Sequence, residues 1–180
     1  DPQAYFVPDV VCDFSNVTLE QAGPDRVEVS GVRGYPPPAD YKVCATVRDG
    51  WRATSLELVM GMDAARKVER QARAVFARTD EMLEARGWSP LTSTRVDAIG
   101  AETTYGPRSR GRDSREVVGK LTADHPDPAA LWVFIQESIA VNCDMSVGSA
   151  SLYGAFPQVS EVVRVFSFLL SRDELEARVD

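Results

Sequence analysis

Residues 51–87 decide the fold and read WRATSLELVMGMDAARKVERQARAVFARTDEMLEARG. The first ten residues favour a strand, and Asp63 stands where a helix N-cap is expected. Apolar residues then recur on one face at helical spacing from Val68 to Leu83, while charged residues occupy most of the other face. Gly87 is typical of the residue just beyond a helix, so the pattern predicts a strand followed by an amphipathic helix that runs to about Arg86.

The chain beyond this helix repeats the alternation of strand and helix. Strands are predicted over residues 92–104, 116–123 and 162–169. Asp127 and Pro128 supply the N-cap and the first position of a second helix, which is apolar nearly all round and runs to about residue 142. The order from residue 51 onward is therefore strand, helix, strand, strand, helix, strand, as in the ferredoxin-like split βαβ unit.

The first fifty residues favour antiparallel hairpins. Alternating stretches at residues 17–21 and 26–30 flank the turn at Gly23, and stretches at residues 41–47 and 51–60 flank the dipeptide Asp49-Gly50. We therefore predict an α+β fold in a single domain over residues 1–180. In that domain the β-hairpin strands of residues 1–50 precede a βαββαβ part in residues 51–180.

The composition argues against several classes of partner. A net charge of −7 and a pI near 4.8 disfavour nucleic acid, because a domain that neutralises phosphates usually carries the opposite sign. The longest apolar run, residues 162–170, is too short to cross a bilayer, and no signal peptide is visible. Cys12, Cys44 and Cys143 are far apart and form no CxxC pair, which favours a reducing compartment. The expected location is the cytoplasm, with neither membrane nor nucleic acid as a partner.

A cluster of arginines is the first candidate binding site. Arg108, Arg110, Arg112 and Arg115 lie between two predicted strands of an acidic protein. Guanidinium groups suit phosphates and carboxylates, and a coenzyme A thioester would offer both. The alternative is an exposed loop whose arginines are simply solvated.

A loop of small residues, residues 146–154, is the second candidate. Its members Ser146, Gly148, Ser149 and Ser151 would let backbone amides approach an anion closely. The segment matches neither the Walker lysine pattern nor GxGxxG, so a serine-rich connector is the alternative interpretation. The two loops would support one another as a binding site if they lie at the same end of the sheet.

Few residues point to acid–base or metal chemistry. Glu102 is the candidate general acid or base, although no second carboxylate stands at a useful spacing. His125, the single histidine, ends a predicted strand just before a helix and favours a structural role in a turn. With one histidine and scattered cysteines, no metal site is expected.

Several stretches together resemble the acyclic terpene utilisation (AtuA-like) family. They are residues 8–14, 17–31, 41–43 with 48–52, 100–106 and 162–170. The resemblance covers nearly the whole chain and corresponds to a middle segment of the family's long domain. It implies a part in bacterial breakdown of acyclic terpenes such as citronellol and geraniol through coenzyme A thioesters, with a lyase-like role on a branched hydroxyacyl-CoA. It carries no catalytic residue onto this sequence.

Three hypotheses for the function remain open. The first is a domain or subunit of an enzyme of branched acyl-CoA catabolism, with much of the site supplied by the family's N-terminal region in cis or in trans. The second is a non-catalytic oligomerisation or assembly module within a homo- or hetero-oligomer. The third is a regulatory small-molecule binder. The sequence opens Asp1-Pro2 without an initiator methionine, which favours a segment of a larger protein or complex.

Overall fold

The computed structural model describes residues 1–152, 154 and 156–175, and it divides into two compact units. Unit 1 comprises Asp1–Thr46 with Val165–Asp180, and unit 2 comprises Val47–Arg164. Tyr153 of the predicted serine-rich loop lies outside the described residues. Within the described part of the chain, no helix is both long and apolar enough to span a membrane.

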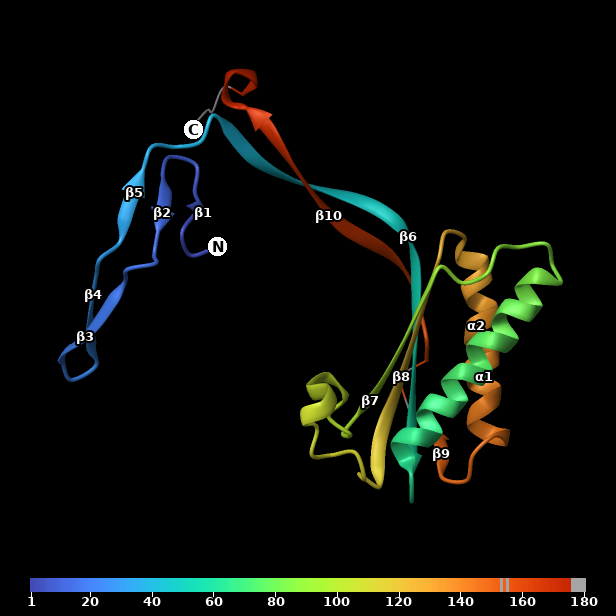
Figure 1. The fold of residues 1–180 in the computed structure, drawn as a ribbon. Helices are drawn as coiled ribbons and strands as arrows, with labels where there is room; N and C mark the ends of the chain where they lie inside the picture. The colour runs from blue at the N-terminus through green and yellow to red at the C-terminus, as the bar shows by residue number, and fades with distance from the viewer. Residues whose placement is uncertain (153, 155, 176–180) are drawn as a thin grey trace. The chain divides into compact units, whose positions relative to one another are not determined.

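Unit 2 contains a sheet with two helices on one of its faces (Figure 1). Its strand order is β10-β6-β8-β7, and the short strand β9 also pairs with β6. The elements in chain order are β6 (Asp40–Met60), α1 (Ala64–Glu84), β7 (Ser93–Ile99), the 3-10 helix η1 (Thr103–Arg108), β8 (Glu116–His125), α2 (Pro128–Asp144), β9 (Ser149–Ser151) and β10 (Val159–Ser171). This combination of helices and antiparallel pairs confirms the predicted α+β class. Strands β6 and β10 share one sheet as predicted, and the ferredoxin-like assignment itself stays a prediction.

The core of unit 2 lies between the sheet and the two helices. Side chains of β6 alternate between the two faces of the sheet, so that Ala53, Ser55, Glu57 and Val59 are buried on the helix side. The fully buried residues that they meet come from both helices and include Val68, Ala72, Leu131, Phe134 and Ile135. Phe134 stacks on Phe76 at a centroid distance of 5.8 Å. Trp132 of the same helix points away and is 47% exposed.

The helix ends follow the sequence only in part. Asp127 caps α2 as predicted, with its carboxylate accepting the Ala129 N–H at 2.8 Å. Gly87 has φ +73° and donates its N–H to the Glu84 carbonyl, as predicted for a residue beyond a helix end. Asp63 is the N-cap residue of α1 as predicted, and its carbonyl accepts the Lys67 N–H at 2.9 Å, but its backbone is left-handed (φ +57°) and its side chain makes no capping hydrogen bond.

The predicted hairpin between residues 41–47 and 51–60 is wrong. Strand β6 runs through Asp49 and Gly50 without turning. Its partner β8 ends at His125, opposite Trp51, and a Cβ on Gly50 (φ +81°) would lie 3.1 Å from the His125 carbonyl oxygen. The glycine therefore allows a close backbone approach within a continuous strand, where the dipeptide had indicated a turn.

Unit 1 is built from short antiparallel strands. A three-stranded sheet has the order β1-β2-β5, and β3 pairs with β4 as the predicted hairpin. The strands are β1 (Tyr5–Phe6), β2 (Val11–Asp13), β3 (Thr18–Gly23), β4 (Arg26–Ser30) and β5 (Arg33–Tyr35), and a 3-10 turn, η2 (Arg172–Glu174), follows β10. One face of the β3–β4 hairpin carries the exposed residues Leu19, Val27 and Val29.

Candidate functional site

The arginine loop (residues 106–115) is held against the end of β7 by a set of polar contacts. The Glu102 carboxylate accepts the backbone N–H of Arg110 at 2.7 Å. The hydroxyl of Ser109 donates to the Ala101 carbonyl at 2.8 Å, and that of Ser114 donates to the Gly100 carbonyl at 3.0 Å. The loop is therefore closed on the residues that follow β7, and Glu102 contributes to that closure. Its use as a general acid or base stays a prediction.

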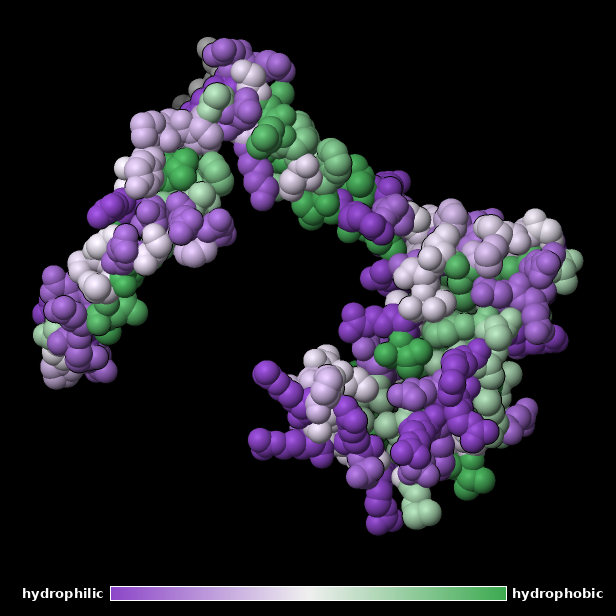
Figure 2. Space-filling model, viewed as in Figure 1, coloured by the Kyte–Doolittle hydropathy of each residue, from purple (hydrophilic) through white to green (hydrophobic). Residues whose placement is uncertain are grey.

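The four predicted arginines of this loop are all exposed. Arg112 donates to the Gly106 carbonyl at 3.1 Å, which steadies the loop. None of the ion pairs formed among the described residues involves Arg108, Arg110, Arg112 or Arg115. Hydrophilic side chains project from the segment around η1 (Figure 2). The cluster is positive and accessible, as an anion-binding loop requires.

A cavity of about 580 Å³ adjoins the loop on the side of α1. Arg66 and Glu69 line it from the first turns of α1, and Arg112 and Asp113 line it from the arginine loop. Two guanidinium groups and two carboxylates thus face one space that is large enough for a small ligand.

The arginine loop and the serine loop (residues 146–154) meet the same end of β6. The Met60 N–H donates to the Gly148 carbonyl at 2.8 Å, and the Gly61 N–H donates to the Arg115 carbonyl at 2.8 Å. Lys67 of α1 donates to the carbonyls of Met60 and Val147, each at 2.9 Å. The two candidate loops therefore adjoin Met60, the last residue of β6, and Gly61, which follows it. They lie at the same end of the sheet, as a shared binding site requires.

The serine loop is more strongly engaged in structure than its composition indicated. Ser149 and Ser151 belong to β9, which pairs with β6. The Ser149 hydroxyl accepts from the Gln71 side-chain amide at 2.8 Å, and its N–H donates to the Ser146 carbonyl at 3.2 Å. Gly148 has φ +88°, and a Cβ there would lie 2.5 Å from the Met60 carbonyl oxygen. These contacts favour the connector interpretation for the described part of the loop.

Glu57 is a buried carboxyl that the sequence did not single out. Glu57 is only 2% exposed, and desolvation by burial raises the pKa of its carboxyl group from 4.5 to about 7. It lies on the helix side of β6, directly opposite Gly119 of β8. The alternation of β6 carried a signal for it, since Glu57 falls on the same face as Ala53 and Val59.

His125 has the structural role that the sequence indicated. It is 4% exposed at the end of β8. Its Nδ1 accepts the Asp127 N–H at 2.9 Å, so its Nε2 carries the proton in the neutral ring and donates to the Ser89 carbonyl at 3.1 Å. The ring joins the segment after α1 to the start of α2. Among the described residues, no group of three or more His, Cys, Asp or Glu side chains is arranged to hold a metal ion.

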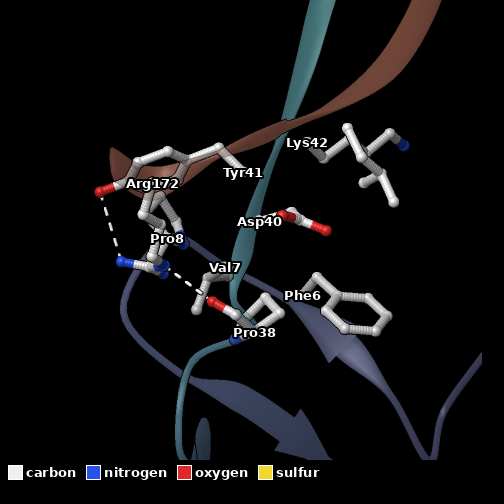
Figure 3. Close-up of a pocket in the computed structure, with 9 residues that line it drawn as sticks. Phe6, Val7, Pro8, Pro38, Asp40, Tyr41, Lys42 and Arg172 are labelled. Atoms are coloured by element: carbon white, nitrogen blue, oxygen red, sulfur yellow. Dashed lines mark hydrogen bonds between the residues drawn. The ribbon is translucent and has the colours of Figure 1, made fainter. Parts of the chain in front are cut away.

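Unit 1 contains a separate cavity of about 470 Å³ (Figure 3). Arg172 stacks on the ring of Tyr41 at 4.3 Å and donates through Nε to the Pro38 carbonyl at 2.7 Å. It also donates to the carbonyl of Pro8. Phe6 and Lys42 line the same space. No local pattern in the sequence indicated this cavity, because its lining residues come from both ends of the chain.

The structure defines an α+β protein in which two polar loops adjoin one end of a sheet that is covered by helices on one face. The chain belongs to the family described as acyclic terpene utilisation family protein AtuA, whose model matches residues 1–180. The resemblance found in the sequence is thereby confirmed. No curated protein and no solved structure matches the chain.

Proposed function

We propose that this chain takes part in the utilisation of acyclic terpenes and that its arginine loop binds the phosphate groups of a coenzyme A thioester. Membership of the AtuA family supports the first part of this proposal. The second part rests on one observation, the cavity of about 580 Å³ between α1 and the arginine loop. Arg66 and Arg112 face it, and further arginines of the loop stand beside it in solvent.

The chemistry of the loop fits an anionic ligand better than a structural ion pair. Guanidinium groups form bidentate, charge-assisted hydrogen bonds with phosphate oxygens. A carboxylate partner would already satisfy the arginines in a structural network, and the ion pairs of the described residues include none of the four. A phosphate-bearing ligand would supply the missing negative charge.

Catalysis in such a protein would draw on groups outside this loop. Glu102, the candidate acid or base, has one carboxylate oxygen engaged by the Arg110 N–H. We therefore assign this chain the binding of the coenzyme portion, within a lyase-like enzyme of branched acyl-CoA metabolism. The family's N-terminal region, in cis or in trans, would supply the reacting groups.

Arg112→Ala is expected to weaken the binding of coenzyme A by about tenfold to a hundredfold, because one charge-assisted contact contributes about 1.5–3 kcal/mol. Isothermal titration of the chain with coenzyme A measures this change. Arg73→Ala is the matched control, since Arg73 is an exposed arginine of α1 that does not line the cavity. Equal affinity of Arg112→Ala and the wild type, or no binding by the wild type, would contradict the proposal.

An assembly module is the second candidate function, and the exposed apolar residues of unit 1 favour it. Leu19, Val27 and Val29 are 67%, 56% and 59% exposed on one face of the β3–β4 hairpin. An isolated two-stranded hairpin is marginally stable in water, so a covering partner would stabilise it. Hydrophobic residues also lie at the surface along β10 (Figure 2), where Val165 and Leu169 are 65% and 70% exposed. Exposed apolar patches of this kind mark contacts.

Val29→Lys is expected to reduce the mass of an assembly of this chain to that of the 19.7 kDa monomer. A charge placed on the apolar face would have to be desolvated in the interface, at a cost of several kcal/mol. Sedimentation velocity gives the mass of each variant. Glu28→Lys, which places a lysine on the opposite face of the same strand, is expected to leave the mass unchanged. A wild-type chain that sediments as a monomer at high concentration would exclude self-assembly through this face.

A further inference from the structure

Glu57 occupies a space that the neighbouring strand leaves for it. Gly119 is its direct partner in the β6–β8 ladder, and a Cβ on Gly119 would lie 2.9 Å from both Cγ and Oε1 of Glu57. The same Cβ would lie 3.0 Å from Cγ2 of Val68. Real Cβ atoms do not approach other atoms so closely without a shift. The glycine therefore makes room for a carboxyl group beneath α1.

Among the residues that the structure describes, none forms an ion pair with the carboxyl group of Glu57. Its Oε1 atom is buried and accepts no hydrogen bond from the described residues. Facing it are Gly119 from β8, Val68 from α1 and Ser151 from β9, none of which is titratable or charged. The nearby cation of α1, Lys67, is engaged with two backbone carbonyls, and the buried polar residues of α2 are the neutral Ser138 and Asn142. The protonated form of Glu57 is therefore the one that this environment favours.

Strand β9 lies beside this group in the sheet. It pairs with β6 only from Val59 to Glu57, and Ser151 lies directly opposite Glu57. Its three residues are Ser, Ala and Ser, so it contributes no large apolar side chain to the core. Besides its ladder with β6 and its contact with α2, it is attached by the Gln71–Ser149 hydrogen bond and by the backbone bond from Met60 to Gly148. Segments with so little apolar burial open at low free energy.

We propose that β9 is a proton-controlled lid on β6, docked while Glu57 is protonated and released when Glu57 ionises. Loss of the proton to solvent leaves a carboxylate that needs water. Ser151 is exposed and lies opposite Glu57, so separation of β9 from β6 gives water a route to the carboxylate. Burial raises the pKa of Glu57 from 4.5 to about 7, so the stability that its proton gives to docked β9 declines between these two pH values and is lost above about pH 7. Release of β9 would also break the hydrogen bond between Met60 and Gly148. The next residue, Gly61, holds the end of the arginine loop by donating its N–H to the Arg115 carbonyl.

Hydrogen exchange of single amides, corrected for the intrinsic effect of pH, tests this lid. Between about pH 5.5 and 8.5, protection of the Met60 amide is expected to fall about thirtyfold, because the open state ionises near 4.5 and the closed state near 7. Glu57→Gln, which stays neutral, is expected to abolish this response. Glu116→Gln removes an exposed carboxyl at the end of β8 that pairs with Met60. This variant is expected to retain the pH response of the Met60 amide.

Two results would overturn the lid. One is equal protection of the Met60 amide in the wild-type chain at both pH values. The other is a parallel loss of protection at the Met60 amide and throughout α1 and β8, which would show global unfolding and no local opening of β9. Both results come from the wild-type chain, so they do not depend on whether Glu57→Gln folds normally.

Discussion

Glu57→Gln is expected to remove about 3 kcal/mol of pH dependence from the free energy of unfolding of this chain. Burial raises the pKa of Glu57 from 4.5 to about 7, so the folded state binds the proton more tightly than the unfolded chain. The stabilising contribution of that proton is complete below about pH 4.5. It declines as the pH rises from there and is lost once the pH passes about 7. Glutamine has nearly the same shape and no proton to lose, so the variant lacks this dependence.

Urea unfolding at about pH 5 and pH 8 measures the effect as a difference between the wild type and the variant. The comparison is needed because other carboxyl groups also contribute to the pH dependence of both proteins. Glu116→Gln serves as the control, since Glu116 is exposed at the start of β8 and its loss is expected to leave most of the dependence in place. Equal changes of stability with pH in the wild type and Glu57→Gln would show that Glu57 is already ionised in the folded state.

The helices and most strands were predictable because their signals are local. The spacing of apolar residues in α1, the cap at Asp127 and the glycine at position 87 each act over a few residues. The error at Gly50 has a physical origin in glycine itself. The same residue type serves a tight turn and a close backbone approach, and only the position of the His125 carbonyl distinguishes the two.

The environment of Glu57 could not be predicted, because it depends on strand register. Glu57 and Gly119 are far apart in the sequence, and their pairing follows from the antiparallel ladder between β6 and β8. A shift of one residue in that ladder would place another side chain opposite the carboxyl group. The proximity of the arginine and serine loops has the same origin, since each reaches the end of β6 through a backbone hydrogen bond to Met60 or Gly61.

The prediction of α2 as a buried helix was also only partly specific, because the contacts of each side chain depend on how the helix packs on the sheet. Its sequence is apolar nearly all round, which indicated a buried helix without saying which residues meet the sheet. In the structure Phe134 is fully buried against Phe76, while Trp132 is 47% exposed. Phe134 therefore belongs to the core of unit 2, whereas Trp132 stays accessible to solvent or to a partner.

Phe134→Ala is expected to lower the free energy of unfolding by about 4 kcal/mol, through lost burial and the cavity that remains among well-packed neighbours. Urea unfolding at constant pH measures the loss. Trp132→Ala is the matched control, because it removes a larger side chain from the same helix at a half-exposed position, and its cost is expected to be less than half as great. A cost for Trp132→Ala as large as that for Phe134→Ala would mean that a partner covers this face of α2 in solution. Such a result would favour the assembly module over the coenzyme-binding function, since it would place an interface on α2, which does not line the cavity beside the arginine loop.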